Sequence, residues 1–216
     1  MLNQMAEKKK KTDELLKNIL PEHVAFELKQ FGRVEVRLHE QVCVMFADFT
    51  NFTAVSSSMD TQELVRELNI CFTEIDHIAE RFDAEKFKTI RDGYLCVTGL
   101  LNKAKCPANS LLMAALAMRD FIEQRRLQKE AEGRVYWGVR LGLHVGPVVA
   151  GVVGQHKFAF DIWGDTVNIA ARLETAGMQP SLPAAASPSK GAAKWKCFLS
   201  SLWLKRPWKC SHKVWL

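Results

Sequence analysis

The stretch Val42-Cys-Val-Met-Phe-Ala-Asp48 decides the fold, because it is a continuous apolar run that contains β-branched residues and ends in a carboxylate. Apolar residues without polar alternation, over this short length, predict a strand that is covered on both faces. Asp48 would then lie at the end of a buried strand. An acidic side chain in that position is a candidate for a functional role.

Helices and strands are predicted on either side of this run. Pro21 suits a first helical turn, and Val24, Leu28 and Phe31 share one face of a helix that Gly32 ends. Further helices are predicted over 60–82, 109–129 and 165–176, the first opened by a capping box of Asp60 and Glu63, with strands over 87–90, 94–97 and 135–145. This order favours an α+β sandwich with helices packed on a largely antiparallel sheet.

The formal net charge of +6 is unevenly distributed along the 216 residues. All 24 acidic residues lie at or before Glu174, whereas seven of the 30 basic residues follow Gly177, so 23 basic residues accompany the 24 acidic ones. A nearly neutral body gives no electrostatic case for a nucleic-acid partner. No stretch approaches the roughly 20 apolar residues of a transmembrane segment, and the cysteines form no CxxC pair. These features predict a cytoplasmic chain.

Two acidic residues are candidates for a metal site. Asp92 lies in Arg91-Asp92-Gly93, a tight-hairpin signal between two predicted strands. If this hairpin neighbours the strand that ends at Asp48, the two carboxylates converge, and carboxylates with phosphate oxygens are ligands that Mg²⁺ prefers. Either residue alone is equally well explained as a turn or cap residue. The polar turn over 49–53 could offer backbone N–H groups to phosphates.

Three segments together resemble the catalytic domain of class III nucleotide cyclases, the adenylate and guanylate cyclase family. They are 46–53, 85–94 and 160–172, and the similarity covers roughly residues 15 to 176 in the same order. The resemblance implies a ferredoxin-like α/β sandwich of the nucleotide cyclase type. It implies a reaction that converts a nucleoside triphosphate to a cyclic nucleotide and pyrophosphate.

The resemblance also divides the chain into three parts. Residues 1–35 are expected to form an N-terminal helical linker or dimerisation segment, and residues 36–177 an incomplete catalytic domain. Residues 178–216 depart from the family pattern and are expected to be a disordered, basic, Trp-rich tail. An interfacial membrane tether and the product of an alternative exon are both open interpretations of this tail.

The implied metal ligands are Asp48, Asp92 and the backbone carbonyl of Phe49, with two Mg²⁺ or Mn²⁺ ions per site. One ion would lower the pKa of a ribose hydroxyl, and the other would hold the triphosphate and the departing pyrophosphate. The turn that the resemblance assigns to substrate binding consists of Asn51, Phe52 and Thr53.

Lys88 and Asp161 are the implied readers of the base. A lysine can donate to N1 of adenine and an aspartate can accept from its exocyclic amine, whereas guanine presents the opposite polarity at both positions. Guanylate cyclases generally place Glu and a small Cys or Ser at these points. The pair therefore favours ATP and an adenylate cyclase, with a guanylate cyclase as the alternative within the family. Taken alone, the two residues would be a strand-edge lysine and a turn aspartate.

Asn168 and Arg172 are four residues apart on the last predicted helix and share one face. By resemblance, Asn168 orients the ribose, and the permanently charged guanidinium of Arg172 stabilises a five-coordinate α-phosphate. Without the resemblance, Arg172 would be an ordinary solvated surface residue.

In the family, metal ligands from one protomer and readers from the other complete each site. This chain carries both sets, so the resemblance implies a homodimer, or a heterodimer with another cyclase domain, with ATP as substrate. An upstream regulatory module and a place at the cytoplasmic face of a membrane are expected in a longer parent protein. A different class remains open, namely an inactive chain that regulates an intact cyclase.

One departure from the family pattern falls within the candidate site. The family usually has Gly where this chain has Arg91, in a turn position that needs a positive φ. Gly93 on the other side of Asp92 offers a way to shift the turn by one residue, which would also move Asp92.

Overall fold

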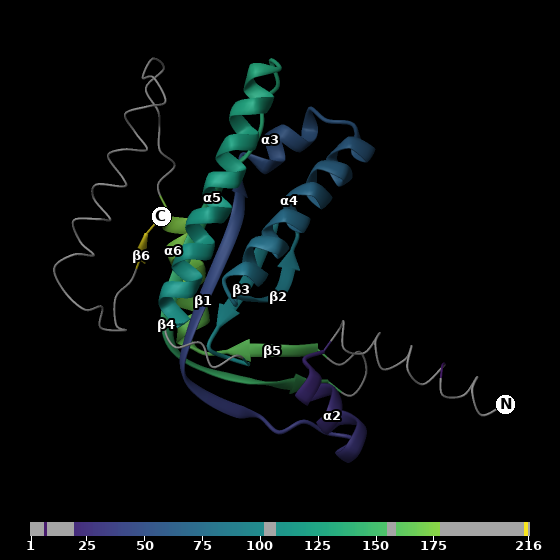
Figure 1. Ribbon diagram of the computed structural model, residues 1–216, viewed down its shortest axis with the longest axis vertical. Helices are drawn as coiled ribbons and strands as arrows, with labels where there is room; N and C mark the ends of the chain where they lie inside the picture. Colours follow the sequence, from purple (N-terminus) through teal and green to yellow (C-terminus); the bar gives the residue numbers. More distant parts are fainter. Residues whose placement is uncertain (1–6, 8–19, 102–106, 155–158, 178–213, 216) are drawn as a thin grey trace.

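A computed structural model of the chain describes residues 7, 20–101, 107–154, 159–177 and 214–215 (Figure 1). The elements are α2 (Glu22–Phe31), β1 (Arg37–Thr50), α3 (Phe52–Ser57), α4 (Thr61–Arg81), β2 (Glu85–Ile90), β3 (Gly93–Thr98), α5 (Pro107–Ala131), β4 (Gly138–Val153), β5 (Ala159–Trp163), α6 (Asp165–Ala176) and β6 (Val214–Trp215). Most of residues 1–19 and of the tail lie outside the described residues, so the expectations for both segments do too.

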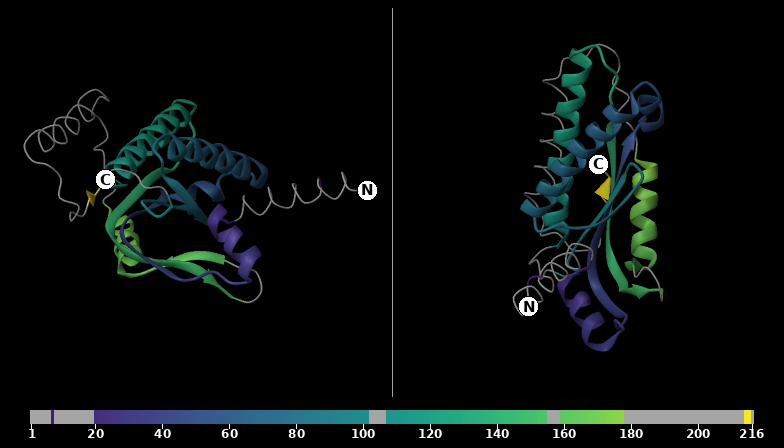
Figure 2. Two further views of the ribbon diagram at one scale, coloured as in Figure 1. Left: turned by 60° about the horizontal axis from the view of Figure 1, so that its bottom comes forward. Right: turned by 90° about the vertical axis from the view of Figure 1, so that its right-hand side faces the viewer.

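The sheet has the strand order β2-β3-β1-β4-β5, with β6 paired to β4, and every pair is antiparallel. Helices α4 and α5 cover one face and α6 covers the other (Figure 2, right-hand view). The predicted α+β sandwich on a largely antiparallel sheet is confirmed. Among the described helices, none combines the length and apolar character that crossing a membrane requires.

β1 is buried on both faces because alternate side chains enter two different cores. Cys43, Met45 and Ala47 pack in the core under α4 and α5, whereas Val42 and Val44 pack in the core under α6. Each of the five side chains is less than 5% exposed. β3 and β4 occupy the two hydrogen-bonding edges of β1. The apolar run therefore forms the centre of the sheet, as its composition predicted.

The helices on the first face have the predicted buried sides, but the predicted capping box at the start of α4 is incomplete. In α5, Leu112, Met118 and the residues between them on the same face are buried. At the start of α4, the carboxylate of Asp60 accepts a hydrogen bond from the N–H of Gln62 at 2.9 Å, as an N-cap does. Glu63 pairs with Arg134 and does not complete the predicted capping box.

α2 packs only through its first turns. Val24 is fully buried and forms a small apolar cluster with Leu20 and Ala25. Neighbours packed against this cluster include Val34, Val152 and Phe160. Phe31 is 69% exposed, so the described part of this chain leaves the far end of the predicted apolar face uncovered. Gly32 ends the helix in the left-handed conformation, as expected.

β4 is longer than the sequence predicted and begins later, because it spans Gly138–Val153 and not 135–145. Pro147 lies within this strand, opposite the irregularity in β1 between His39 and Val42. Since a proline cannot donate to the ladder, it is tolerated where the ladder is already interrupted. β5, which pairs with the far end of β4, was not predicted.

The sheet curves so strongly that its two edge strands touch. The rings of Phe87 on β2 and Phe160 on β5 have centroids 5.6 Å apart. The neighbouring side chains of Lys88 and Asp161 also meet. Strands β2 and β5, at opposite ends of the strand order, thus bring their side chains into contact.

The backbone of α6 lies directly on β4 at Gly142. A Cβ atom on Gly142 would lie 2.1 Å from the backbone nitrogen of Glu174 and 2.4 Å from the carbonyl oxygen of Ala170. Only the absence of a side chain allows this approach.

Substituting Gly142→Ala should therefore destabilise the domain by about 3 kcal/mol or more, because backbone atoms of α6 must move. The matched control is Gly133→Ala, where an added Cβ meets nothing within 4 Å but φ is +75°. The control should lose only about 1 kcal/mol. Chemical denaturation measures both values, and equal losses would contradict the role of the close approach.

Candidate functional site

The structure brings the two predicted metal carboxylates together. Asp48 lies directly opposite Gly93 in the β1–β3 ladder, next to Asp92 in the β2–β3 turn. Burial raises the pKa of Asp48 above its ordinary value, and the negative charges of Asp92 and Glu174 raise it further. The two carboxylates therefore lie close enough for the charge of Asp92 to act on Asp48, as the sequence predicted from neighbouring strands.

An arginine that the sequence analysis missed lies beside them. Arg140 on β4 donates from Nη2 to Oδ2 of Asp48 at 2.7 Å and from Nε to Oε1 of Glu174 at 2.8 Å. The side chain of Glu174 is only 11% exposed. The sequence feature that could have identified Arg140 is a charged residue between the apolar neighbours Val139 and Leu141 in a predicted strand.

The residues present fit a divalent cation in their chemistry. Asp48, Asp92 and the carbonyl of Phe49 are oxygen donors at the end of one strand and in the adjacent turn. Nowhere in the described part of the chain do three or more His, Cys, Asp or Glu side chains cluster as a metal cage. Mg²⁺ usually keeps several waters and binds through one or two carboxylates together with substrate phosphates. A site with two carboxylates is consistent with that preference.

The turn after Asp48 is held on an aromatic platform. Asn51 adopts φ = 58° and is exposed, and Phe52 begins α3. The ring centroids of Phe49 and Phe52 lie 5.3 and 5.7 Å from that of Trp137, which is fully buried. The carbonyl of Thr53 accepts hydroxyl hydrogen bonds from within α3. Trp137, which the sequence analysis did not single out, thus supports the predicted substrate-binding turn.

Lys88 and Asp161 are brought into direct contact. Nζ of Lys88 donates to Oδ2 of Asp161 at 2.5 Å. Oδ1 of Asp161 accepts from the N–H of Ile162 at 2.9 Å. The two side chains are 39% and 29% exposed, so both remain accessible to a ligand.

Asn168 and Arg172 lie on the exposed face of α6. Ala170 and Leu173 form the buried side of the same helix. The predicted pair therefore shares a solvent-facing surface and points away from this chain's own core.

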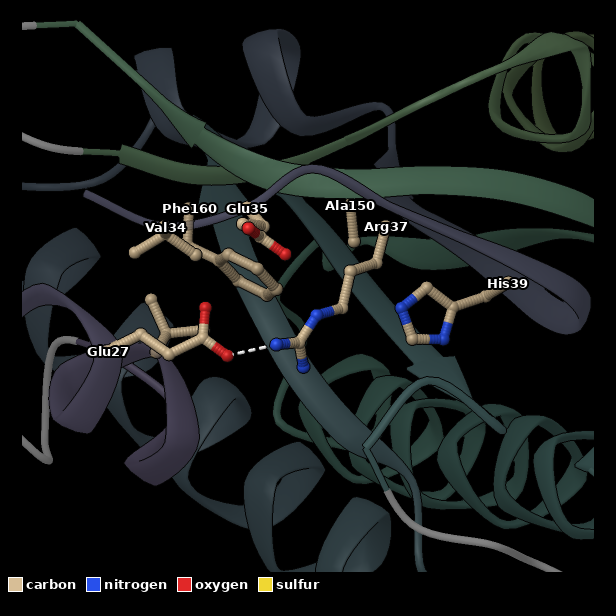
Figure 3. Close-up of a pocket in the computed structure, with 8 residues that line it drawn as sticks. Glu27, Val34, Glu35, Arg37, His39, Ala150 and Phe160 are labelled. Atoms are coloured by element: carbon tan, nitrogen blue, oxygen red, sulfur yellow. Dashed lines mark hydrogen bonds and ion pairs between the residues drawn. The ribbon is translucent and has the colours of Figure 1, made fainter. Parts of the chain in front are cut away.

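A small hollow lies elsewhere, between α2 and the ends of β1, β4 and β5 (Figure 3). Its lining consists of Val24, Glu27, Val34, Glu35, Arg37, His39, Ala150 and Phe160. Arg37 donates across it to Glu27. No predicted site residue lines this hollow, so we do not assign the site to it.

Comparison with known proteins identifies the family. Residues 34–185 match the family model described as the adenylate and guanylate cyclase catalytic domain, and the chain belongs to this family. Atrial natriuretic peptide receptor 2 of Rattus norvegicus is 33% identical over 193 residues, which make up 89% of this chain and 18% of that protein. Several other relatives are described as guanylate cyclases. The chain thus spans less than a fifth of the length of its first relatives.

Solved structures give the same result. The catalytic core of a rhodopsin-guanylyl cyclase with converted specificity, in complex with ATPαS, is 37% identical, with a TM-score of 0.59 over 66% of this chain and 75% of that chain. The adenylyl cyclase CyaB from P. aeruginosa is 27% identical, with a TM-score of 0.61 over 66% and 74%. The predicted family and fold are confirmed.

Arg91 occupies the turn position where the family usually has glycine. Its φ is +58°, and Gly93 is the first residue of β3, paired with Ile90. The turn therefore has not shifted. Arg91 itself adopts the left-handed conformation, and Asp92 stays beside Asp48.

Substituting Arg91→Gly should stabilise the domain by about 1 kcal/mol, because relief of the left-handed conformation exceeds the entropic cost of glycine. The control is Asp83→Gly, at φ = 55°. Aspartate tolerates this conformation better, so its gain should be smaller. Thermal and denaturant unfolding compare the two, and a loss of stability in Arg91→Gly would contradict strain at the turn.

Proposed function

We propose that this chain is an adenylate cyclase domain that converts ATP to 3′,5′-cyclic AMP and pyrophosphate. The observation that carries the nucleotide choice is the contact between Lys88 and Asp161. A lysine donor and an aspartate acceptor match N1 and the exocyclic amine of adenine. Guanine would leave both groups facing the wrong polarity, at a cost of roughly 1–3 kcal/mol for each unpaired group.

The remaining residues have separate roles in the proposed reaction. Asp48, Asp92 and the carbonyl of Phe49 would hold two divalent cations per site, which supply activation of the ribose 3′-hydroxyl and neutralisation of the leaving pyrophosphate. The turn over 51–53 would bind the triphosphate. Asn168 would orient the ribose for in-line attack of its 3′-oxygen on the α-phosphorus. Arg172 would donate to the α-phosphate oxygens as their charge increases.

We propose that two chains share each site, in a homodimer or with another cyclase domain. The outward direction of Asn168 and Arg172 supports this arrangement. An exposed apolar row also supports it: Leu38, Val149 and Trp163 are neighbours across β1, β4 and β5, with Leu38 60% and Trp163 40% exposed. Such a row is typical of a surface that a partner covers.

The longer relatives suggest a larger parent protein. We propose that an upstream regulatory module acts through residues 1–35 on a catalytic domain that begins near residue 36. The receptor named among the relatives makes the cytoplasmic face of a membrane a reasonable location for such a parent. The basic tail over 178–216 has no role in the proposed mechanism.

A guanylate cyclase is the second candidate, favoured by the names of several relatives. With Mn²⁺, the purified chain should show a kcat/KM for ATP at least about tenfold above that for GTP, since one mispaired base group is worth that factor. The double variant Lys88→Glu with Asp161→Cys should reverse the preference. Lys86→Glu is the control, because Lys86 pairs with Asp76 and not with Asp161. Faster turnover of GTP by the unmodified chain would overturn the adenylate assignment.

Mixing two inactive variants tests the shared site. Asp48→Ala and Arg172→Ala, each inactive alone, should together regain about a quarter of the original activity, because half of randomly mixed dimers carry one intact site of two. Asp48→Ala mixed with Asp92→Ala should stay inactive, since both changes remove metal ligands. If neither mixture recovers activity, the site is not shared.

A further inference from the structure

Arg140 is positioned to neutralise Asp48, and the proposed mechanism gives it no role. It lies directly opposite Asp48 in the β1–β4 ladder, so the contact joins nearest neighbours on adjacent strands. Its guanidinium bridges Asp48 and Glu174 with donor–acceptor distances of 2.7 and 2.8 Å. A single cation thus connects the end of the central strand to helix α6.

The two oxygens of Asp48 face different groups. Oδ2 accepts from Arg140. Oδ1 lies on the side of the β2–β3 hairpin, where a Cβ added to Gly93 would be 3.6 Å from it. Asp92 belongs to this hairpin, so the oxygen that Arg140 does not contact is the one that faces the hairpin carrying the second carboxylate.

Glu174 cannot readily move away from this place. Its backbone nitrogen lies against Gly142, where even a Cβ atom would be 2.1 Å away. Oε2 accepts from the hydroxyl of Thr175 at 3.2 Å, while Oε1 accepts from Arg140. The Arg140 side chain is 29% exposed and that of Glu174 is 11% exposed, so the arginine is the more solvent-accessible partner.

The local charges are compatible with a divalent ion. Asp48, Asp92 and Glu174 contribute three negative charges and Arg140 one positive charge, which leaves a formal charge of −2. A divalent cation entering beside Asp48 would meet this charge and would also meet the guanidinium as a competitor for the same carboxylate.

We propose that Arg140 is the resident counter-cation of Asp48, with which an incoming divalent metal competes, and that Glu174 is a positioning residue that limits the hold of Arg140 on Asp48. This inference rests on the metal site of the proposed function. In an alternative arrangement, the Arg140–Glu174 pair only ties β4 to α6 and has no effect on the metal.

The proposed roles of Arg140 and Glu174 predict opposite effects of their substitution on Mn²⁺ binding. Arg140→Gln removes the competitor, so the nucleotide-free chain should bind Mn²⁺ about fivefold more tightly. Glu174→Gln leaves Arg140 with Asp48 as its remaining partner, so binding should weaken by about fivefold. In the double variant, the effect of Glu174→Gln should fall below about twofold, because the residue through which it acts is absent.

The measurement is a titration of the full chain with Mn²⁺, with free Mn²⁺ followed by electron paramagnetic resonance at constant pH and ionic strength. Arg126→Gln is the matched control, because Arg126 is also held between two carboxylates, Glu123 and Glu130, but on α5. Circular dichroism establishes that each variant is folded. If Glu174→Gln does not fold, the sign of the Arg140→Gln effect still decides.

Asp48→Ala separates the two possible failures. If Asp48→Ala abolishes Mn²⁺ binding while Arg140→Gln weakens it or leaves it unchanged, the proposed competition is wrong and the metal site stands. If Asp48→Ala leaves Mn²⁺ binding intact, the metal site of the proposed function fails, and the inference about Arg140 fails with it.

Discussion

The burial of β1 on both faces is the constraint on which the rest of this structure depends. Its alternating side chains supply one core under α4 and α5 and another under α6, and its two edges bind β3 and β4. A strand in this position cannot carry a charge until it leaves the cores. Asp48 is therefore found at the end of the run, where its side chain becomes 30% exposed. The position of the acidic group follows from the packing.

Helix α6 connects this central strand to the face of the proposed dimer. Its backbone lies on β4 at Gly142, which fixes the depth and rotation of the helix. With that rotation, Glu174 points inward to Arg140, whereas Asn168 and Arg172 face solvent. One short helix thus supports the proposed metal site of its own chain and carries the proposed nucleotide-binding residues on its solvent-facing side.

The predictable part of the site is the part whose residues are adjacent in local motifs. The convergence of Asp48 and Asp92 could be predicted because short-range patterns reveal both the buried strand and the hairpin. The two are neighbours in the sheet. Arg140 and Glu174 were missed, since their meeting depends on the approach of α6 to β4. The far end of β4 and the whole of β5 were not predicted, and Pro147 lies within β4 where a bulge in β1 accommodates it. Phe31 is exposed because the residues that cover α2 pack against its first turns, which is a tertiary contact.

The sequence by itself determined the family, the central strand and the identity of the acidic, basic and amide groups, because these are properties of residue type and short-range spacing. Only the tertiary structure decided which of those groups meet. The contact of Lys88 with Asp161 requires a sheet curved enough to bring its edge strands together, and the bridge through Arg140 requires a helix backbone against a glycine. Curvature and close approach arise from long-range packing of many side chains, and no local pattern encodes them.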